Sequence, residues 1–184
     1  AAPAVTQGPP LSITGINVPA GCNATVIYEA ALNEYAPLGT EASVTNTATV
    51  SGTGITPVTA AETVNAEAAP NLAITKSVSP VPVTENGTLT YTFRIQNYGS
   101  VAATNTTGVV ITDTFAPVLN NLTAALNGTA WTAATDYTYN EATGTFSSTA
   151  GAITVPAATY TQDSTTGAWV VTPGESTLVI TGTV

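Results

Sequence analysis

Short stretches in which apolar and polar residues alternate recur along this chain of 184 residues, and turn-forming residues separate them. A period of two places every second side chain on the same face of a β-strand. The chain is rich in Thr and Val, which favour strands, and its 15 glycines and 12 prolines favour turns. These features predict an all-β protein.

The alternation locates the expected strands, and pairs such as Asn86-Gly87 and Asn127-Gly128 locate hairpin turns between them. Many short strands with frequent turns are typical of an immunoglobulin-like β-sandwich. The expected strands cover residues 11–17, 24–32, 44–50, 58–65, 72–78, 89–96, 109–113, 122–126, 137–139, 145–147, 153–155, 160–162, 168–172 and 177–184.

The only lysine of the chain interrupts one apolar face. Within residues 72–78, Lys76 shares its face with Leu72, Ile74 and Val78, so we expect it to point toward the core. The only arginine, Arg94, alternates against apolar neighbours and is expected to face water.

Two further polar side chains share the apolar face of their strands. Asn46 lies on the same face as Val44, Ala48 and Val50, and Asp113 lies on the face of Ile111. A buried amine, carboxamide and carboxylic acid are costly unless they are paired or covalently joined. Lys76, Asn46 and Asp113 are therefore the candidate site residues.

The charge balance argues against several kinds of function. Eleven acidic and two basic residues give a net charge of −9, which cannot neutralise phosphates, so nucleic acid is not an expected partner. The chain has no histidine and one cysteine, Cys22, so no internal disulfide and no Ser-His, Cys-His or zinc arrangement can form. We expect no enzyme, cofactor or metal. Cys22 is interpreted as a half-buried strand residue, with an intermolecular bridge or a reactive thiol as alternatives.

No run of residues approaches the roughly 20 apolar residues that a membrane-spanning helix needs, and no leader pattern opens the sequence. We therefore expect a mature, soluble chain without membrane insertion.

The two ends of the chain resemble each other. Residues 5–8 and 11–15 (VTQG and LSITG) match residues 171–174 and 178–182 (VTPG and LVITG) when one residue is skipped. This similarity favours a duplicated strand. The stretch 68–70 (AAP) is the clearest internal boundary.

The sequence resembles, in permuted order, the surface-protein repeat called domain of unknown function 11. Residues 71–80 (NLAITKSVSP), 89–100 (LTYTFRIQNYGS) and 110–115 (VITDTF) are similar to its opening half, and residues 44–50 (VTNTATV) to its closing strand. The resemblance implies an N-terminal arm over 1–18, a closing half over 19–67, a linker over 68–70 and an opening half over 71–184. A hairpin-rich insertion occupies about 127–172 of that opening half.

Two arrangements could complete such permuted halves. In the first, the closing half of one molecule completes the opening half of its neighbour, which builds a head-to-tail homopolymer by strand exchange. In the second, the chain folds back and completes itself as a circularly permuted monomer. We favour the polymer because the duplicated end strand could act as an arm that replaces its copy in a neighbour. A third interpretation is a piece of a long tandem-repeat protein.

The arrangement is also similar to isopeptide-forming domains of Gram-positive pilins. That resemblance implies that Lys76 attacks Asn46, which loses ammonia, while Asp113 carries the proton. The reaction needs a neutral amine and a protonated acid, and apolar surroundings favour both. A hydrogen-bonded cluster of the same three residues without a covalent bond is the alternative.

Weaker candidates complete the sequence-based predictions. Acids at Asp136, Glu141 and Asp163 could ligate calcium but are interpreted as solvated turn residues. Five tripeptides fit the glycosylation pattern, beginning at Asn23, Asn86, Asn105, Asn121 and Asn127. Aromatic residues of the insertion could stack on surface glycans, although packing is their more ordinary use. These residues are Trp131, Trp169, Tyr137, Tyr139 and Tyr160.

The function expected from the sequence is a structural subunit of an extracellular filament or surface appendage. The alternative is a cell-surface adhesin or carbohydrate-binding module.

Overall fold

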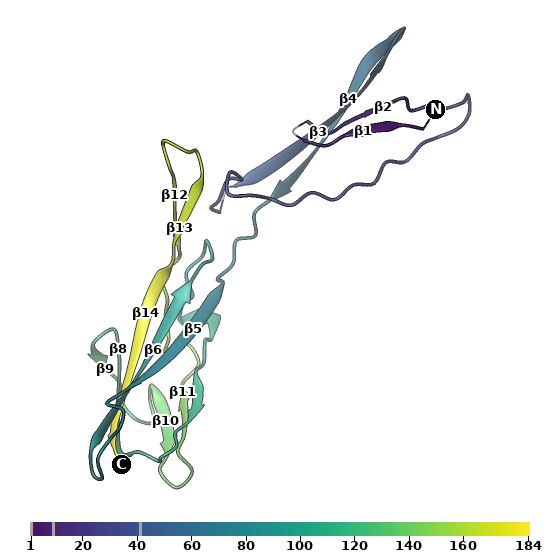
Figure 1. The fold of residues 1–184 in the computed structure, drawn as a ribbon. Coiled ribbons are helices and arrows are strands. Elements are labelled where there is room, and N and C mark those ends of the chain that lie inside the picture. Colours follow the sequence, from purple (N-terminus) through teal and green to yellow (C-terminus); the bar gives the residue numbers. More distant parts are fainter. Residues whose placement is uncertain (1, 9, 41) are drawn as a thin grey trace. The chain divides into compact units, whose positions relative to one another are not determined.

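A computed structural model describes residues 2–8, 10–40 and 42–184 (Figure 1). The chain divides into a unit that ends at Leu32 and a unit that runs from Asn33 to Val184. Within the described ranges every regular element is a strand apart from one 3₁₀ turn, Asn105–Thr107, which confirms the all-β prediction. No helix in those ranges is long and apolar enough to cross a bilayer.

The first unit contains one short antiparallel hairpin. Strand β1 (Ala4–Thr6) pairs with β2 (Ser12–Thr14), and Val5 lies opposite Ile13. Residues 15–32 form no strand, so the prediction of a strand over 24–32 was wrong for this chain. A strand exists only within a hydrogen-bonded ladder, and the alternating sequence of 24–32 pairs with no other strand here.

The second unit begins with a long hairpin that carries Asn46. Strand β3 (Ser43–Gly52) pairs antiparallel with β4 (Ile55–Asn65), with Asn46 opposite Glu62. Almost every side chain of both strands is exposed, including Val50 and Val58. Two strands without a covered face are only marginally stable in water.

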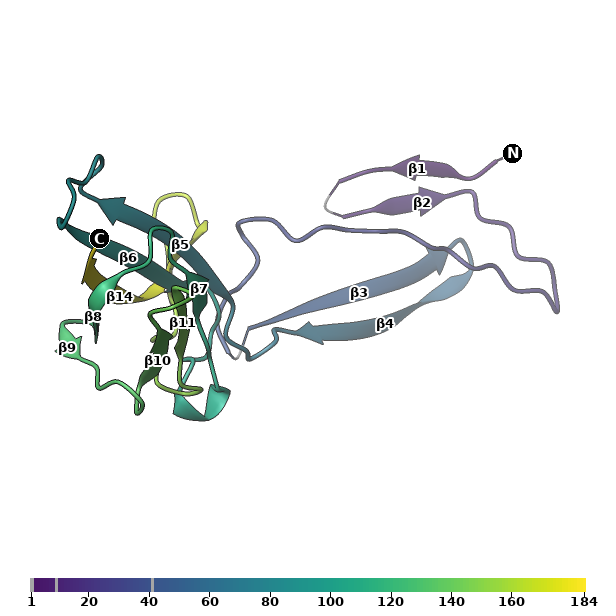
Figure 2. The ribbon, with the colours of Figure 1, turned by 90° about the horizontal axis from the view of Figure 1, so that it is seen from below.

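Residues 70–184 form a compact body with two antiparallel sheets that share one core (Figure 2). The first sheet has the strand order β5-β6-β14-β8-β9, and the second has the order β10-β11-β7. A separate hairpin joins β12 to β13. The strand bounds are β5 Leu72–Ser79, β6 Thr88–Asn97, β7 Thr112–Thr114, β8 Asn120–Leu126, β9 Thr129–Ala130, β10 Tyr137–Asn140, β11 Thr145–Ser148, β12 Thr159–Gln162, β13 Trp169–Thr172 and β14 Gly174–Thr183.

Period-two alternation builds the core of the body. Alternate residues of β6 and β14 are buried, and the ring of Phe115 packs 4.7 Å from that of Tyr91. Arg94 faces outward as predicted and forms an ion pair with Glu175 across the sheet. Among the described residues, none before Leu89 is buried. The core therefore lies entirely within the body.

Most predicted strands of the body are present with shifted ends. Residues 153–155 form no strand and make one isolated bridge between Ala103 and Val155. Pro156 comes directly after that bridge and has no N–H to continue a ladder. Strand β7 begins at Thr112 rather than at residue 109. The predicted Asn127-Gly128 turn is confirmed, since both residues have positive φ, as a two-residue hairpin loop requires.

The side chain of Asn97 fastens the end of β6 to three neighbouring segments. Its Oδ1 accepts hydrogen bonds from the backbone N–H groups of Asn71 and Gly99, and its Nδ2 donates to the carbonyls of Val101 and Pro156. The side chain is fully buried. All its hydrogen-bonding capacity is used, so no group of similar size can replace it without leaving a buried partner unsatisfied.

We predict that Asn97→Asp lowers the free energy of unfolding of the body by about 2–4 kcal/mol, because a carboxylate cannot donate to the two carbonyls. Urea denaturation followed by tryptophan fluorescence measures the change. Asn65→Asp, at the exposed end of β4, is the matched control and should change stability by less than about 0.5 kcal/mol. Equal effects of the two substitutions would contradict the role assigned to Asn97.

The turn between β12 and β13 is organised by Asp163. Its Oδ1 accepts hydrogen bonds from the backbone N–H groups of Thr165 (2.9 Å) and Thr166 (2.7 Å) and from the Thr166 hydroxyl. These donors favour the ionised carboxylate and lower the pKa of Asp163 below its ordinary value.

Because folding lowers this pKa, the carboxylate stabilises the turn above the ordinary pKa of an aspartic acid, about 3.9. The stabilisation is lost as the pH falls through the lower pKa of the folded chain. We expect the amide resonances of Thr165 and Thr166 to titrate in NMR spectra with a midpoint below that ordinary value. Asp163→Asn should abolish this titration, and an unshifted midpoint would refute the assignment.

Candidate functional site

Lys76 lies on the core-facing side of the edge strand β5. Lys76 pairs with Phe93 of β6, and its neighbour Ile74 pairs with Ile95. Directly opposed residues of an antiparallel pair point to the same face, and Phe93 and Ile95 are buried. The face of β5 that carries Lys76 and Ile74 is therefore turned toward the core side of the sheet, as the sequence predicted.

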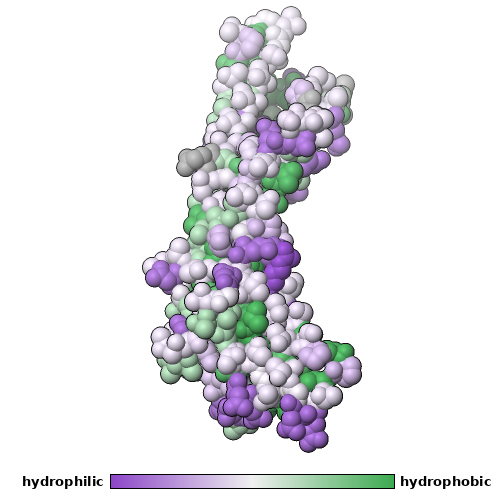
Figure 3. Space-filling model, turned by 90° about the vertical axis from the view of Figure 1, so that its left-hand side faces the viewer, coloured by the Kyte–Doolittle hydropathy of each residue, from purple (hydrophilic) through white to green (hydrophobic). Residues whose placement is uncertain are grey.

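The side chains on that face of β5 are nevertheless exposed. Ile74 is 52% exposed, whereas its cross-strand partner Ile95 is 3% exposed, and Leu72 and Val78 are exposed as well. Strand β5 is the edge of its sheet, the opposing sheet ends at β7, and no described strand lies beyond β7 to cover this face. Apolar residues of the chain also reach the surface elsewhere, as the view in Figure 3 shows in green.

The ammonium group of Lys76 is held at this uncovered margin by an acid and three aromatic rings. It forms an ion pair with Oδ2 of Asp113 on β7. It also lies 4.8 Å from the ring centroid of Tyr91, 5.3 Å from that of Phe115 and 5.5 Å from that of Phe93. Cation–π attraction and the ion pair fix the position of the amine, while 40% of the lysine side chain stays exposed.

Asp113 is the more enclosed partner of this pair. Its side chain is 19% exposed, and it lies between Ile111 and Phe115, which are buried. Its Oδ1 accepts a hydrogen bond from the backbone N–H of Thr114 at 2.9 Å. The carboxylate therefore has a fixed orientation, with one oxygen directed at the lysine.

The structure brings two of the three predicted site residues together. Lys76 and Asp113 are in contact across the margins of the two sheets, although the lysine is not enclosed as its parity suggested. Asn46 lies in the separate β3–β4 sheet, opposite Glu62. The site thus consists of an oriented amine and a carboxylate beside an uncovered apolar strip, to which a carboxamide could be added from outside the body.

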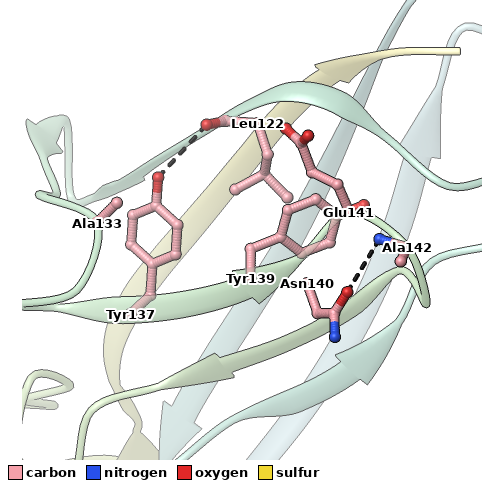
Figure 4. Close-up of a pocket in the computed structure, with 7 residues that line it drawn as sticks. All are labelled: Leu122, Ala133, Tyr137, Tyr139, Asn140, Glu141 and Ala142. Atoms are coloured by element: carbon pink, nitrogen blue, oxygen red, sulfur yellow. Dashed lines mark hydrogen bonds between the residues drawn. The ribbon is translucent and has the colours of Figure 1, made fainter.

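A hollow of about 630 Å³ lies next to β10 (Figure 4). The hydroxyls of its two tyrosines make hydrogen bonds within the body. The Tyr139 hydroxyl accepts from the backbone N–H of Leu119 and donates to the Leu119 carbonyl, and the Tyr137 hydroxyl donates to the carbonyl of Leu122. Burial raises the pKa of Tyr137. These bonds favour packing rather than sugar stacking as the use of both tyrosines.

The other aromatic candidates also make structural contacts. Trp131 packs against the core, Trp169 pairs with Gln162 in the β12–β13 hairpin, and the hydroxyl of Tyr160 donates to the carbonyl of Tyr98. Cys22 is exposed and lies outside any strand, so its interpretation as a half-buried strand residue was wrong.

The acids considered for calcium binding do not gather. Asp136 accepts a hydrogen bond from the backbone N–H of Thr132, Asp163 organises its own turn, and Glu141 lines the hollow beside β10. Over the described ranges, no group of three or more His, Cys, Asp or Glu residues is placed to hold a metal ion.

Comparison of the chain with protein-family models, with curated proteins and with solved structures found no match.

Sequence reasoning missed two features of the site. The first is the exposure of β5, which depends on how many strands the opposing sheet supplies and leaves no mark on the alternation. The second is the aromatic surround of Lys76, although the inward parity of Tyr91 and Phe93 on the next strand could have indicated it.

We predict that Ile74→Ala and Ile95→Ala, which truncate directly paired residues, differ sharply in the monomeric chain. Ile95→Ala should cost about 2–5 kcal/mol because it leaves a cavity, and Ile74→Ala less than about 1 kcal/mol because its side chain already meets water. Urea unfolding of dilute monomer measures both. A large loss for Ile74→Ala would mean that β5 is already covered within one chain.

Proposed function

We propose that this protein is a structural subunit of an extracellular filament, an immunoglobulin-like body that is completed by strands from the next subunit. The observation that carries the proposal is the uncovered core face of β5 beside the Lys76–Asp113 pair, in a chain whose own β3 carries Asn46 on an exposed hairpin. The resemblance to domain of unknown function 11 and to pilin domains supports the same function.

Both the acceptor strand β5 and the donor strand β3 would be stabilised if the donor of one subunit covered the body of the next. The edge of β5 offers unpaired backbone groups, and three apolar side chains beside it meet water. Strand β3 carries Val44, Ala48 and Val50 on one face, together with Asn46. Pairing β3 with the open edge of β5, with that face turned toward the core, would supply the missing hydrogen bonds and remove apolar surface from water at about 25 cal/mol per Å².

Exchange between molecules fits this chain better than completion within one molecule. Strand β3 pairs with β4, and the described strands of the body pair only among themselves. A donor surface and a different acceptor surface on each subunit make a heterologous contact, which propagates head to tail without closing. The expected product is a linear homopolymer, and the composition and lack of catalytic motifs suit a structural role outside the cell.

The same contact would position the groups of an isopeptide cross-link. When Asn46 of one subunit meets Lys76 of another, a bond forms between the lysine Nζ and the asparagine Cγ, and the bond from Cγ to Nδ2 breaks. Asp113 takes a proton from the amine and delivers it to the departing nitrogen, which leaves as ammonia. The Lys76–Asp113 contact supports this role, since the ion pair and the neutral pair differ only in the position of one proton.

We expect purified protein to form filaments visible by negative-stain electron microscopy as its concentration rises. Ile74→Asp combined with Val78→Asp should abolish them, because two carboxylates would line the acceptor strip. Thr75→Asp combined with Ser77→Asp places the same charges on the opposite face of β5 and is the matched control. A wild-type protein that stays monomeric at high concentration would refute the proposed function.

The cross-link has its own test. Denaturing gels of filaments should show a ladder of covalent oligomers, and intact-mass measurement should show the loss of one ammonia per joint. Lys76→Arg and Asn46→Ala should each remove the ladder while filaments persist, whereas Asn65→Ala on β4 should retain it. Filaments that dissolve into unmodified subunits would show strand exchange without the covalent bond.

A further inference from the structure

The duplicated sequence at the two ends of the chain suggests which segment could follow β14 when a neighbouring subunit completes the body. Strand β14 contains residues 178–182, and its sequence copy, residues 11–15, overlaps β2. The residues directly after the copy are therefore those that the sequence places after a strand of the β14 type. Residues 16–32 of one subunit are thus candidates for a place beside the body of another.

The copy itself is an unsuitable replacement for β14. Strand β14 lies between β6 and β8 and buries Leu178 and Ile180 completely. An incoming arm would have to expel this central strand and its buried side chains. The open strand edges lie instead at the margin of the body, where β5 and β7 are outer strands of the two sheets.

The stretch after the copy has the pattern of a half-buried strand. Over residues 23–32, Ala24, Val26, Tyr28, Ala30 and Leu32 occupy alternate positions, and the other face carries Asn23, Thr25, Ile27, Glu29 and Ala31. One face is apolar at all five positions, whereas the other also carries Asn23, Thr25 and Glu29, and this pattern predicts a strand with one covered face. In this chain the stretch is not a strand, and Val26, Tyr28 and Leu32 are all exposed.

We propose that residues 23–32 enter the neighbouring subunit as a second exchanged strand, which pairs with the free edge of β7. This inference rests on the proposed function and specifies its interface. Strand β7 is the last strand of the three-stranded sheet, so its outer edge can accept an additional strand. Strand β3 pairs with β5 in the opposite sheet and so brings Asn46 beside Lys76, and residues 23–32 then lie next to β7, beneath β3.

The lengths and charges of the segments suit this arrangement. Strand β3 has ten residues and the stretch 23–32 also has ten, and residues 33–42 between them suffice to connect two strands that face each other. Glu29 is the only charged residue of 23–32 and lies on the face that would meet water. The covered face would present apolar groups to the strip that Ile74 and Val78 leave open.

The test compares two faces of the same stretch. Val26→Asp combined with Tyr28→Asp should prevent filament formation and leave the body folded, because both residues are exposed and outside its core. Thr25→Asp combined with Ile27→Asp is the matched control, and filaments should form because these positions would face water. Ile27 is 88% exposed in this chain. Near-ultraviolet circular dichroism verifies the fold of each variant.

A mixing experiment decides whether the strand passes between molecules. The Val26→Asp/Tyr28→Asp variant keeps an intact acceptor, and the Ile74→Asp/Val78→Asp variant keeps intact donor strands. Each should be monomeric alone, and an equimolar mixture should give a dimer of one of each by light scattering coupled to size-exclusion chromatography. A mixture that stays monomeric would overturn exchange of residues 23–32 between subunits.

The outcomes separate this inference from the proposed function. If wild-type protein polymerises and the Val26→Asp/Tyr28→Asp variant polymerises equally well, residues 23–32 are not exchanged, although the filament function stands. If wild-type protein does not polymerise at any concentration, the proposed function and this inference fail together.

Discussion

The covering of one apolar sheet face governs this structure. A strand with an alternating sequence can be stable only when a second layer removes its apolar side from water, and β6 and β14 meet that requirement in full. Strand β5 does not, because the opposing sheet ends at β7. The position of the amine at the margin, and the exchange proposed above, both follow from this difference between two neighbouring strands.

Lys76, the one amine side chain of the sequence, lies on the uncovered face of β5. An amine at the margin of a core is stabilised here by Asp113 and by three aromatic rings, so it is held in place before any partner arrives. A preorganised amine and acid lower the entropic cost of a later reaction. The pair lies beside an uncovered strip, so a strand that covered the strip would bring its own side chains to the amine.

Unused sequence patterns point in the same direction. The β3–β4 hairpin and the stretch 23–32 both have the composition of sheet strands, and neither contributes a buried residue to this chain. Under the proposed function, both segments would cover a core in another molecule. The duplicated ends also suggest a strand order, because residues 16–32 follow a copy of the β14 sequence.

The sequence by itself determined the fold class, the parity of most strands and the turns, because these depend on local alternation and on residues such as Asn127 and Gly128. It also selected Lys76 and Asp113, which the fold then brought together. Parity states which face a residue occupies, but it does not state what lies opposite. Only the tertiary structure decided that β5 is uncovered, that residues 24–32 form no strand and that Asn46 belongs to a separate sheet, because each depends on which distant strands pair.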